Sequence, residues 1–107
     1  MGRKGWSNMA AIRYFGMLEV SAKKDAFGDV KIVVSNVYDM DRDFSIVVIE
    51  GAAFCRLSGS GFDDKDYVAD RGTISDMIGT IIDVSPNQTV GGATDWVMAI
   101  IDAYKHS

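Results

Sequence analysis

The sequence reads VKIVVSNVYDMDRDFSIVVI over residues 30–49. Residues 30–38 and residues 44–49 are rich in β-branched and aromatic types, which favour strands, and a short charged segment separates them. Aspartate favours turns, because its side chain accepts hydrogen bonds from nearby backbone amides. The stretch therefore predicts two antiparallel strands joined at residues 39–43.

Further strands are expected on both sides of this hairpin. Upstream, residues on one face of a predicted strand alternate along the sequence: Ile12, Tyr14, Leu18, Val20 and Ala22. Ala11, Tyr14, Leu18 and Ala22 could also line a helix, and we favour the strand. Downstream, residues 52–57 could return as a short strand before the Ser-Gly-Ser-Gly turn at residues 58–61. The predicted sheet has three to four strands.

The periodicity becomes helical beyond Gly72. Apolar residues recur at helical spacing at Ile74, Met77, Ile78, Ile81 and Ile82. Thr73 is placed to cap the first turn, with Asp76 three residues later. Gly91 and Gly92 interrupt the pattern before a second apolar stripe, formed by Trp96, Val97, Ile100, Ile101 and Tyr104. The sequence predicts helices over about residues 73–84 and 94–105.

Strands followed by helices predict an α+β domain. Its antiparallel sheet occupies the N-terminal two-thirds of the chain, and both C-terminal helices cover one face. A chain of 107 residues has the size of one domain. We expect residues 1–8, with Arg3 and Lys4, to be a flexible basic leader and residues 9–107 to be a single domain. Cys55 is the only cysteine, which excludes an intramolecular disulfide and favours a cytoplasmic setting.

The charge is distributed unevenly along the chain. The net charge is −4, but residues 1–24 hold five basic groups and one acid, which leaves six basic groups and fourteen acids for residues 25–107. Binding to a phosphate backbone needs clustered Lys and Arg, and the acidic part has no such cluster. The composition predicts a protein partner with a basic surface. Neither direct binding to nucleic acid nor association with a membrane is expected.

One candidate site has the spacing of a calcium-binding loop. Asp39, Asp41, Asp43 and Glu50 stand at loop positions 1, 3, 5 and 12 of an EF-hand. Phe44 occupies position 6, where glycine makes the turn, and a strand from Phe44 onward would carry Glu50 roughly 20 Å from the aspartates. We therefore predict an acidic hairpin tip that binds a partner and no cofactor. A calcium site formed by these four residues is the alternative.

A second acidic cluster lies in residues 62–72, which we predict to be a surface loop. Asp63, Asp64 and Asp66 surround Lys65, and Tyr67 follows. A tyrosine among carboxylates suits a contact with a basic protein surface. A divalent metal site and a merely solubilising surface are the other interpretations.

Catalytic groups are sparse. His106, the only histidine, is one residue from the C-terminus, so a base held beside a nucleophile is not expected. A binding protein is therefore favoured over an enzyme. In composition alone, the chain resembles inhibitor and immunity-type proteins that block nucleic-acid enzymes. A small-ligand or catalytic domain with an acidic site is a further alternative, and an edge strand of the hairpin could pair with its twin to form a homodimer.

Overall fold

The computed structural model describes residues 11–24, 26, 28–48, 55–59, 65–67, 69–83 and 87–105. For residues 55–59, 65–67 and 105 it describes the backbone alone. The predicted leader at residues 1–8 therefore lies outside the described residues, as do Glu50, Asp63 and Asp64.

Over the described residues, the chain forms one antiparallel sheet of six strands. The strands are β1 (Ala11–Phe15), β2 (Leu18–Lys24), β3 (Val30–Asn36), β4 (Asp39–Val48), β5 (Cys55–Gly59) and β6 (Lys65–Tyr67). Their order in the sheet is their order in the sequence, so each strand pairs with the next one along the chain. The edges of the sheet are β1 and β6. The strands of the β3–β4 hairpin lie inside it, so the predicted homodimer cannot use that hairpin as an edge.

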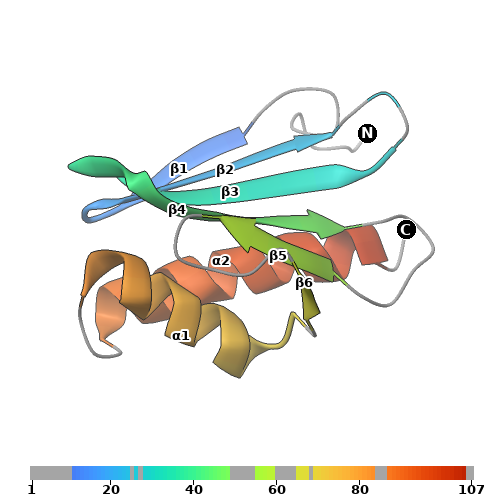
Figure 1. Ribbon diagram of the computed structural model, residues 1–107. Coiled ribbons are helices and arrows are strands. Elements are labelled where there is room, and N and C mark those ends of the chain that lie inside the picture. Colours follow the sequence, from blue (N-terminus) through green and yellow to red (C-terminus); the bar gives the residue numbers. More distant parts are fainter. Residues whose placement is uncertain are drawn as a thin grey trace.

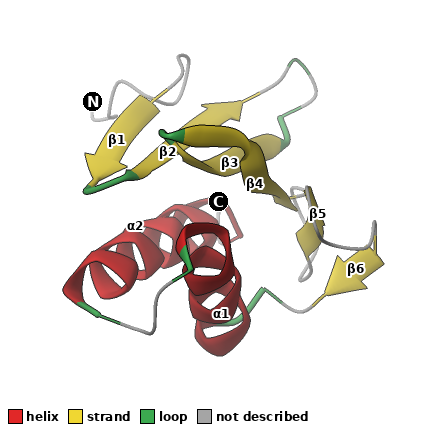
Figure 2. Cartoon of the chain, turned by 60° about the vertical axis from the view of Figure 1, so that its left-hand side comes forward, coloured by secondary structure: helices red, strands yellow, loops and turns green. Residues whose placement is uncertain are grey.

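Two helices follow the strands, α1 (Arg71–Ile82) and α2 (Gln88–Lys105), and both cover the same face of the sheet (Figure 1). The core lies between the layers. Its fully buried side chains include Leu18, Val20, Ile32, Val34, Phe44 and Ile46 from the sheet and Ile74, Ile78, Val97 and Ile100 from the helices. Figure 2 shows the two helices side by side beneath the strands. The predicted α+β class and the placement of the helices are confirmed.

The sheet has more strands than the three to four predicted, partly because the chain reverses at Gly16. Gly16 adopts a φ of 59°, and β1 and β2 pair on either side of it, with Phe15 opposite Leu18. The predicted alternation of residues 12–22 is therefore split between two strands. Leu18 faces the helices, whereas Ile12 and Tyr14 lie on the opposite face and are exposed.

The left-handed conformation of Gly16 gives a testable contrast with Gly91. A Cβ at position 16 would suffer backbone strain and would lie 3.3 Å from Cγ2 of Thr89. We expect Gly16→Ala to lower the free energy of unfolding by about 1–2 kcal/mol. A Cβ at Gly91 in α2 would meet nothing within 4 Å, so Gly91→Ala should raise that free energy by about 0.5–1 kcal/mol. Urea unfolding of both variants tests the contrast, and effects of the same sign would contradict it.

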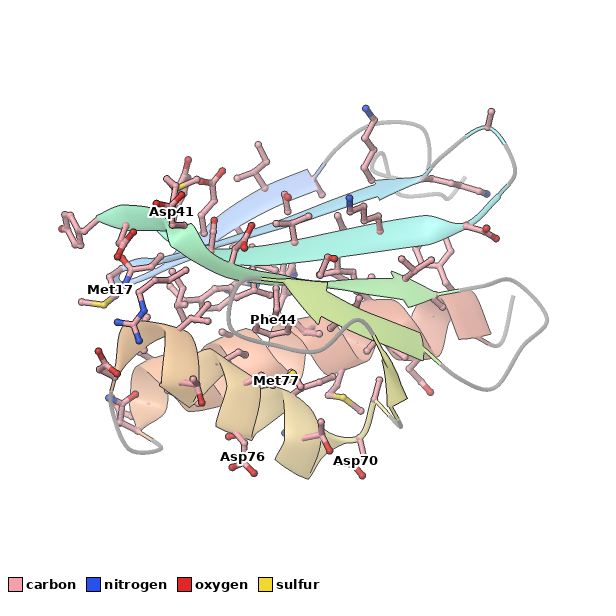
Figure 3. All side chains as sticks on the ribbon, in the orientation of Figure 1. Met17, Asp41, Phe44, Asp70, Asp76 and Met77 are labelled. Atoms are coloured by element: carbon pink, nitrogen blue, oxygen red, sulfur yellow. The ribbon has the colours of Figure 1, made fainter. Side chains whose placement is uncertain are left out.

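The prediction of a loop over residues 62–72 is wrong. Lys65–Tyr67 forms β6, and α1 begins at Arg71. Asp70 caps α1 instead of Thr73, because the Asp70 carboxylate accepts a hydrogen bond of 2.8 Å from the backbone amide of Thr73. Figure 3 shows Asp70 at the beginning of the helix.

The second helix also begins earlier than predicted, at Gln88 instead of residue 94. The Asn87 side chain accepts a hydrogen bond of 2.9 Å from the amide of Val90, which is the pattern of an N-terminal cap. Gly91 and Gly92 lie inside the helix. A Cβ on Gly92 would lie 3.4 Å from the ring of Phe15, so α2 approaches β1 closely at this point. Among the described residues, neither helix is long and apolar enough to cross a membrane.

Candidate functional site at the end of the β3–β4 hairpin

The charged segment at residues 39–43 does not form the turn of the hairpin. The turn is Val37 and Tyr38, and Asp39 already begins β4. Asn36 closes this turn, because its side-chain oxygen accepts a hydrogen bond of 2.8 Å from the amide of Tyr38. The predicted hairpin is confirmed, with its tip displaced toward the N-terminus. We call residues 38–43 the hairpin end.

Asn36 also fastens the hairpin to the helix layer. It is 7% exposed, and its amide donates a hydrogen bond of 3.1 Å to the carbonyl of Ile81 in the last turn of α1. The last carbonyls of a helix have no partner within the helix. One buried side chain therefore satisfies both the turn and the helix terminus.

Arg42 makes a second link to the same terminus. Its guanidinium contacts both carboxylate oxygens of Asp83, at 2.6 and 3.1 Å, and donates a further hydrogen bond of 2.8 Å to the carbonyl of Thr80. Asp83 ends α1 in the left-handed conformation, with φ of 56°. A cation at a helix C-terminus also interacts favourably with the helix dipole. The Arg42 side chain therefore binds within the fold, and Asp39 and Asp41 are the exposed carboxylates of the hairpin end.

Two large apolar side chains are exposed on the hairpin end. Tyr38 is 82% exposed and Met40 is 57% exposed, and they alternate with Asp39 and Asp41, which are exposed as well. In Figure 3, Asp41 lies on the side of the sheet away from the helices. Sequence reasoning identified the aspartates and missed Tyr38 and Met40. The available signal was an aromatic residue and a methionine inside an otherwise charged segment.

Asp66 and Tyr67, which are described residues of the second acidic cluster, do not lie beside the hairpin end. Asp66 and Tyr67 lie in β6, where Asp66 pairs with Arg56 of β5 and Arg56 pairs with Val47 of β4. Val47 is six residues beyond Asp41, or roughly 20 Å along an extended strand. The predicted contact through Asp63, Asp64, Asp66 and Tyr67 therefore stays a prediction about a separate surface.

The predicted calcium ligands Asp39, Asp41 and Asp43 lie within strand β4. The backbone is extended over all ten residues of β4, from Asp39 to Val48. Within the described part of the chain, no three His, Cys, Asp or Glu side chains form a group that could hold a metal ion. Because Glu50 is not described, the calcium alternative through Asp39, Asp41, Asp43 and Glu50 stays a prediction.

The carboxylates at the two ends of α1 predict acid sensitivity. The hydrogen bond from Arg42 holds the pKa of Asp83 below its ordinary value of 3.8, and the bond from the Thr73 amide lowers the pKa of Asp70 in the same way. A pKa that is lower in the folded state adds stability above the unfolded value. That stability is lost as the pH falls below about 3.8 toward the lower folded pKa.

We therefore expect the free energy of unfolding to decrease as the pH is lowered below about 3.8. Asp83→Asn should make this decrease less steep. Urea unfolding at a series of acidic pH values measures the dependence of the free energy on pH. Asp76→Asn removes an equal charge from α1 without touching Arg42 and serves as the control. An unchanged slope in Asp83→Asn would contradict the assignment.

Comparison of the chain with protein-family models, with curated proteins and with solved structures finds no match.

Proposed function

We propose that this protein is a small acidic binding protein without catalytic activity, which works in a cytoplasmic setting and binds a protein with a basic surface through the hairpin end. The observation that carries the proposal is the exposure of Tyr38 and Met40 beside Asp39 and Asp41. Tyrosine and methionine are enriched in protein interfaces, where one aromatic anchor can supply much of the binding energy. Carboxylates around such anchors select a basic partner.

The anchoring of the hairpin end supports a role in recognition. Asn36 and Arg42 tie the segment to the last turn of α1 through contacts with Ile81, Thr80 and Asp83. A binding surface that is held in place before association loses less conformational entropy on binding. Tyr38 can therefore project into solvent from a backbone that is already ordered.

The partner class follows from charge. Enzymes that act on nucleic acids bind phosphates through clustered Lys and Arg, and an acidic surface can occupy such a cluster. An inhibitor or regulator of a nucleic-acid enzyme is the form of this function that we propose. Asp39 and Asp41 would oppose the basic groups, and Tyr38 and Met40 would supply apolar contact.

The proposal is tested by capturing partners with the full chain from the lysate of its own cell, followed by quantitative mass spectrometry. Tyr38→Ser is compared with Tyr14→Ser, which makes the same change at an exposed tyrosine of β1. We expect a basic protein that the wild type and Tyr14→Ser retain and Tyr38→Ser loses. With the recovered protein, Tyr38→Ser should weaken binding by about tenfold or more.

Two further measurements distinguish the alternatives. Binding should weaken with added salt, and Asp41→Asn should reduce that dependence, because screening acts on exposed charges. Equal recovery of every protein by Tyr38→Ser and Tyr14→Ser would reject the hairpin end as the binding surface. A melting temperature that rises with calcium and falls with chelator would favour the calcium alternative.

A further inference from the structure

The sheet has a second face that the helices do not cover. On β2, Leu18, Val20 and Ala22 point to the helices and are fully buried, so Glu19, Ser21 and Lys23 point the other way. Figures 1 and 2 show α1 and α2 on a single side of the sheet, and no other described element lies over the opposite face. We call this opposite face, as far as side chains are described on β1 to β4, the open face.

Charge is distributed along the open face with opposite signs at its two ends. Near the hairpin turns, the cross-strand register aligns Tyr14, Glu19, Ser35 and Asp43, which we call the acidic row. At the other end, Lys23 pairs with Lys31, and Lys31 pairs with Val47, which we call the basic row. Glu19 and Lys23 are four residues apart on β2, or about 13 Å.

The middle of the open face is apolar or small. Between the two charged rows, the register aligns Ile12, Ser21, Val33 and Ser45. Ile12 is 55% exposed, and Tyr14 beside it is 62% exposed. Small and apolar side chains at the centre allow a second flat surface to approach, while the charges lie at the two ends.

Among the described residues, the basic row places two like charges together. Lys23 and Lys31 are directly opposite each other on neighbouring strands. Like charges in that position destabilise a sheet. Carboxylates supplied from outside would remove the repulsion, so the row points to an acidic group on whatever covers this face.

We propose that the open face binds the open face of a second copy of this chain, in a two-fold symmetric dimer. The two-fold axis lies between the two sheets, runs perpendicular to the strands and passes over Ser21 of β2. It therefore reverses the strand direction of the second copy. Glu19 then faces Lys23 of the partner subunit, and the symmetry repeats that contact at the other end. Sheets packed face to face in this way lie about 10 Å apart.

The charge pattern selects a second copy over the basic protein proposed for the hairpin end. A uniformly basic surface would be repelled by Lys23 and Lys31, and a uniformly acidic one by Glu19. A matching surface must carry both signs with the spacing of β2, and a second copy does so by symmetry. The dimer therefore goes beyond the proposed function, and its charged contacts are made by Glu19 and Lys23, which lie outside the hairpin end.

The size of the open face sets the expected strength of the dimer. Four strands spaced about 4.8 Å apart give an area of roughly 20 Å by 20 Å on each copy. Stable interfaces bury about 800 Å² on each partner, so the open face corresponds to a weak association. The dimer should therefore dissociate on dilution in the micromolar range or above.

Charge reversal on β2 tests the dimer. Sedimentation equilibrium of the full chain, from low micromolar to millimolar concentration, should show the wild type passing from monomer to dimer. Glu19→Lys and Lys23→Glu should each weaken dimerisation by at least about tenfold, because each places like charges opposite one another. An equimolar mixture of the two variants should regain a dimer, because both of its contacts then join opposite charges.

The control and a second measurement cover the remaining outcomes. Asp76→Lys makes the same change of charge on α1, away from the sheet (Figure 3), and should dimerise as the wild type does. Amide resonances of the wild type should shift on dilution at Ser21 and Val33, which needs no variant to fold. The proposal would be overturned if the wild type stayed monomeric or if the single variants dimerised normally. It would also be overturned if the mixture did not associate, or if the dilution shifts were confined to the helices. Loss of the dimer with unchanged capture through Tyr38 would separate this surface from the hairpin end.

Discussion

Phe44→Ala is expected to lower the free energy of unfolding by about 3–5 kcal/mol. Phe44 is 1% exposed and is among the largest fully buried side chains described. It pairs with Val34 of β3 and Gly59 of β5, and its side chain points to the helix layer that carries Met77 (Figure 3). Removing the ring loses its transfer free energy and leaves a cavity between the sheet and the helices.

The effect is measured by urea unfolding followed by circular dichroism. Tyr38→Ala removes an aromatic ring from the same hairpin at a position that is 82% exposed, and it should change the free energy by less than about 0.5 kcal/mol. Phe44→Leu keeps most of the volume and should cost about 1–1.5 kcal/mol. Equal effects of Phe44→Ala and Tyr38→Ala would contradict the position of the core.

Asn36→Ala is expected to cost about 2–3 kcal/mol, because two hydrogen bonds disappear together. The carbonyl of Ile81 loses its buried donor, and the amide of Tyr38 loses its acceptor. Leaving a buried polar group without a partner costs about 1–3 kcal/mol. The same change should loosen the hairpin end, which would appear as faster hydrogen exchange at Tyr38.

Asn36→Asp tests the hydrogen bond that the Asn36 amide donates to Ile81, because aspartate has nearly the same shape as asparagine but no amide donor. An aspartate there would accept from Tyr38 but would place a carboxylate against the carbonyl oxygen of Ile81. Burial and this repulsion would raise its pKa in the folded state. Its protonated form can donate a hydrogen bond, so the cost relative to the wild type should be smallest at low pH and should grow as the pH rises through the folded pKa. A cost independent of pH would show that the side chain of residue 36 is not buried against α1.

The sequence was sufficient to predict features that depend on periodicity. The spacing of Ile74, Ile78, Ile81 and Ile82 predicted the buried side of α1, and all four are buried. Strand-forming residues on both sides of a charged segment predicted the β3–β4 hairpin. These patterns arise because a regular element buries one face, which repeats along the sequence.

Features that depend on tertiary contacts were not predicted. Gly91 and Gly92 read as an interruption, yet α2 passes through them because Val90 and Ala93 are buried against the core. Burial outweighs an intrinsic helix cost of about 1 kcal/mol for each glycine. The chain reversal at Gly16 was missed because one left-handed glycine has no periodic signal.

Of the candidate site, the sequence predicted the acidic side chains but not the contacts that hold them in place. The aspartates at positions 39, 41 and 43 are visible in the sequence, but the role of Arg42 depends on Asp83, which is 41 residues away. Asn36 likewise bonds to Ile81, 45 residues away. Because these two contacts fix which side chains project, the exposure of Tyr38 and Met40 could not be derived from local spacing.

The sheet also has a consequence for how the chain folds. Every strand pairs with its neighbour in sequence, so the sheet consists of contacts between nearby segments, which are quick to form because little loop entropy is lost. The helices follow the strands in the sequence, so during synthesis the ribosome releases the strands first. Until α1 and α2 emerge, Leu18, Ile32 and Ile46 have no cover. We expect a chain ending before Arg71 to aggregate, and the growing chain to depend on chaperones until residues 71–105, which contain both helices, have been made.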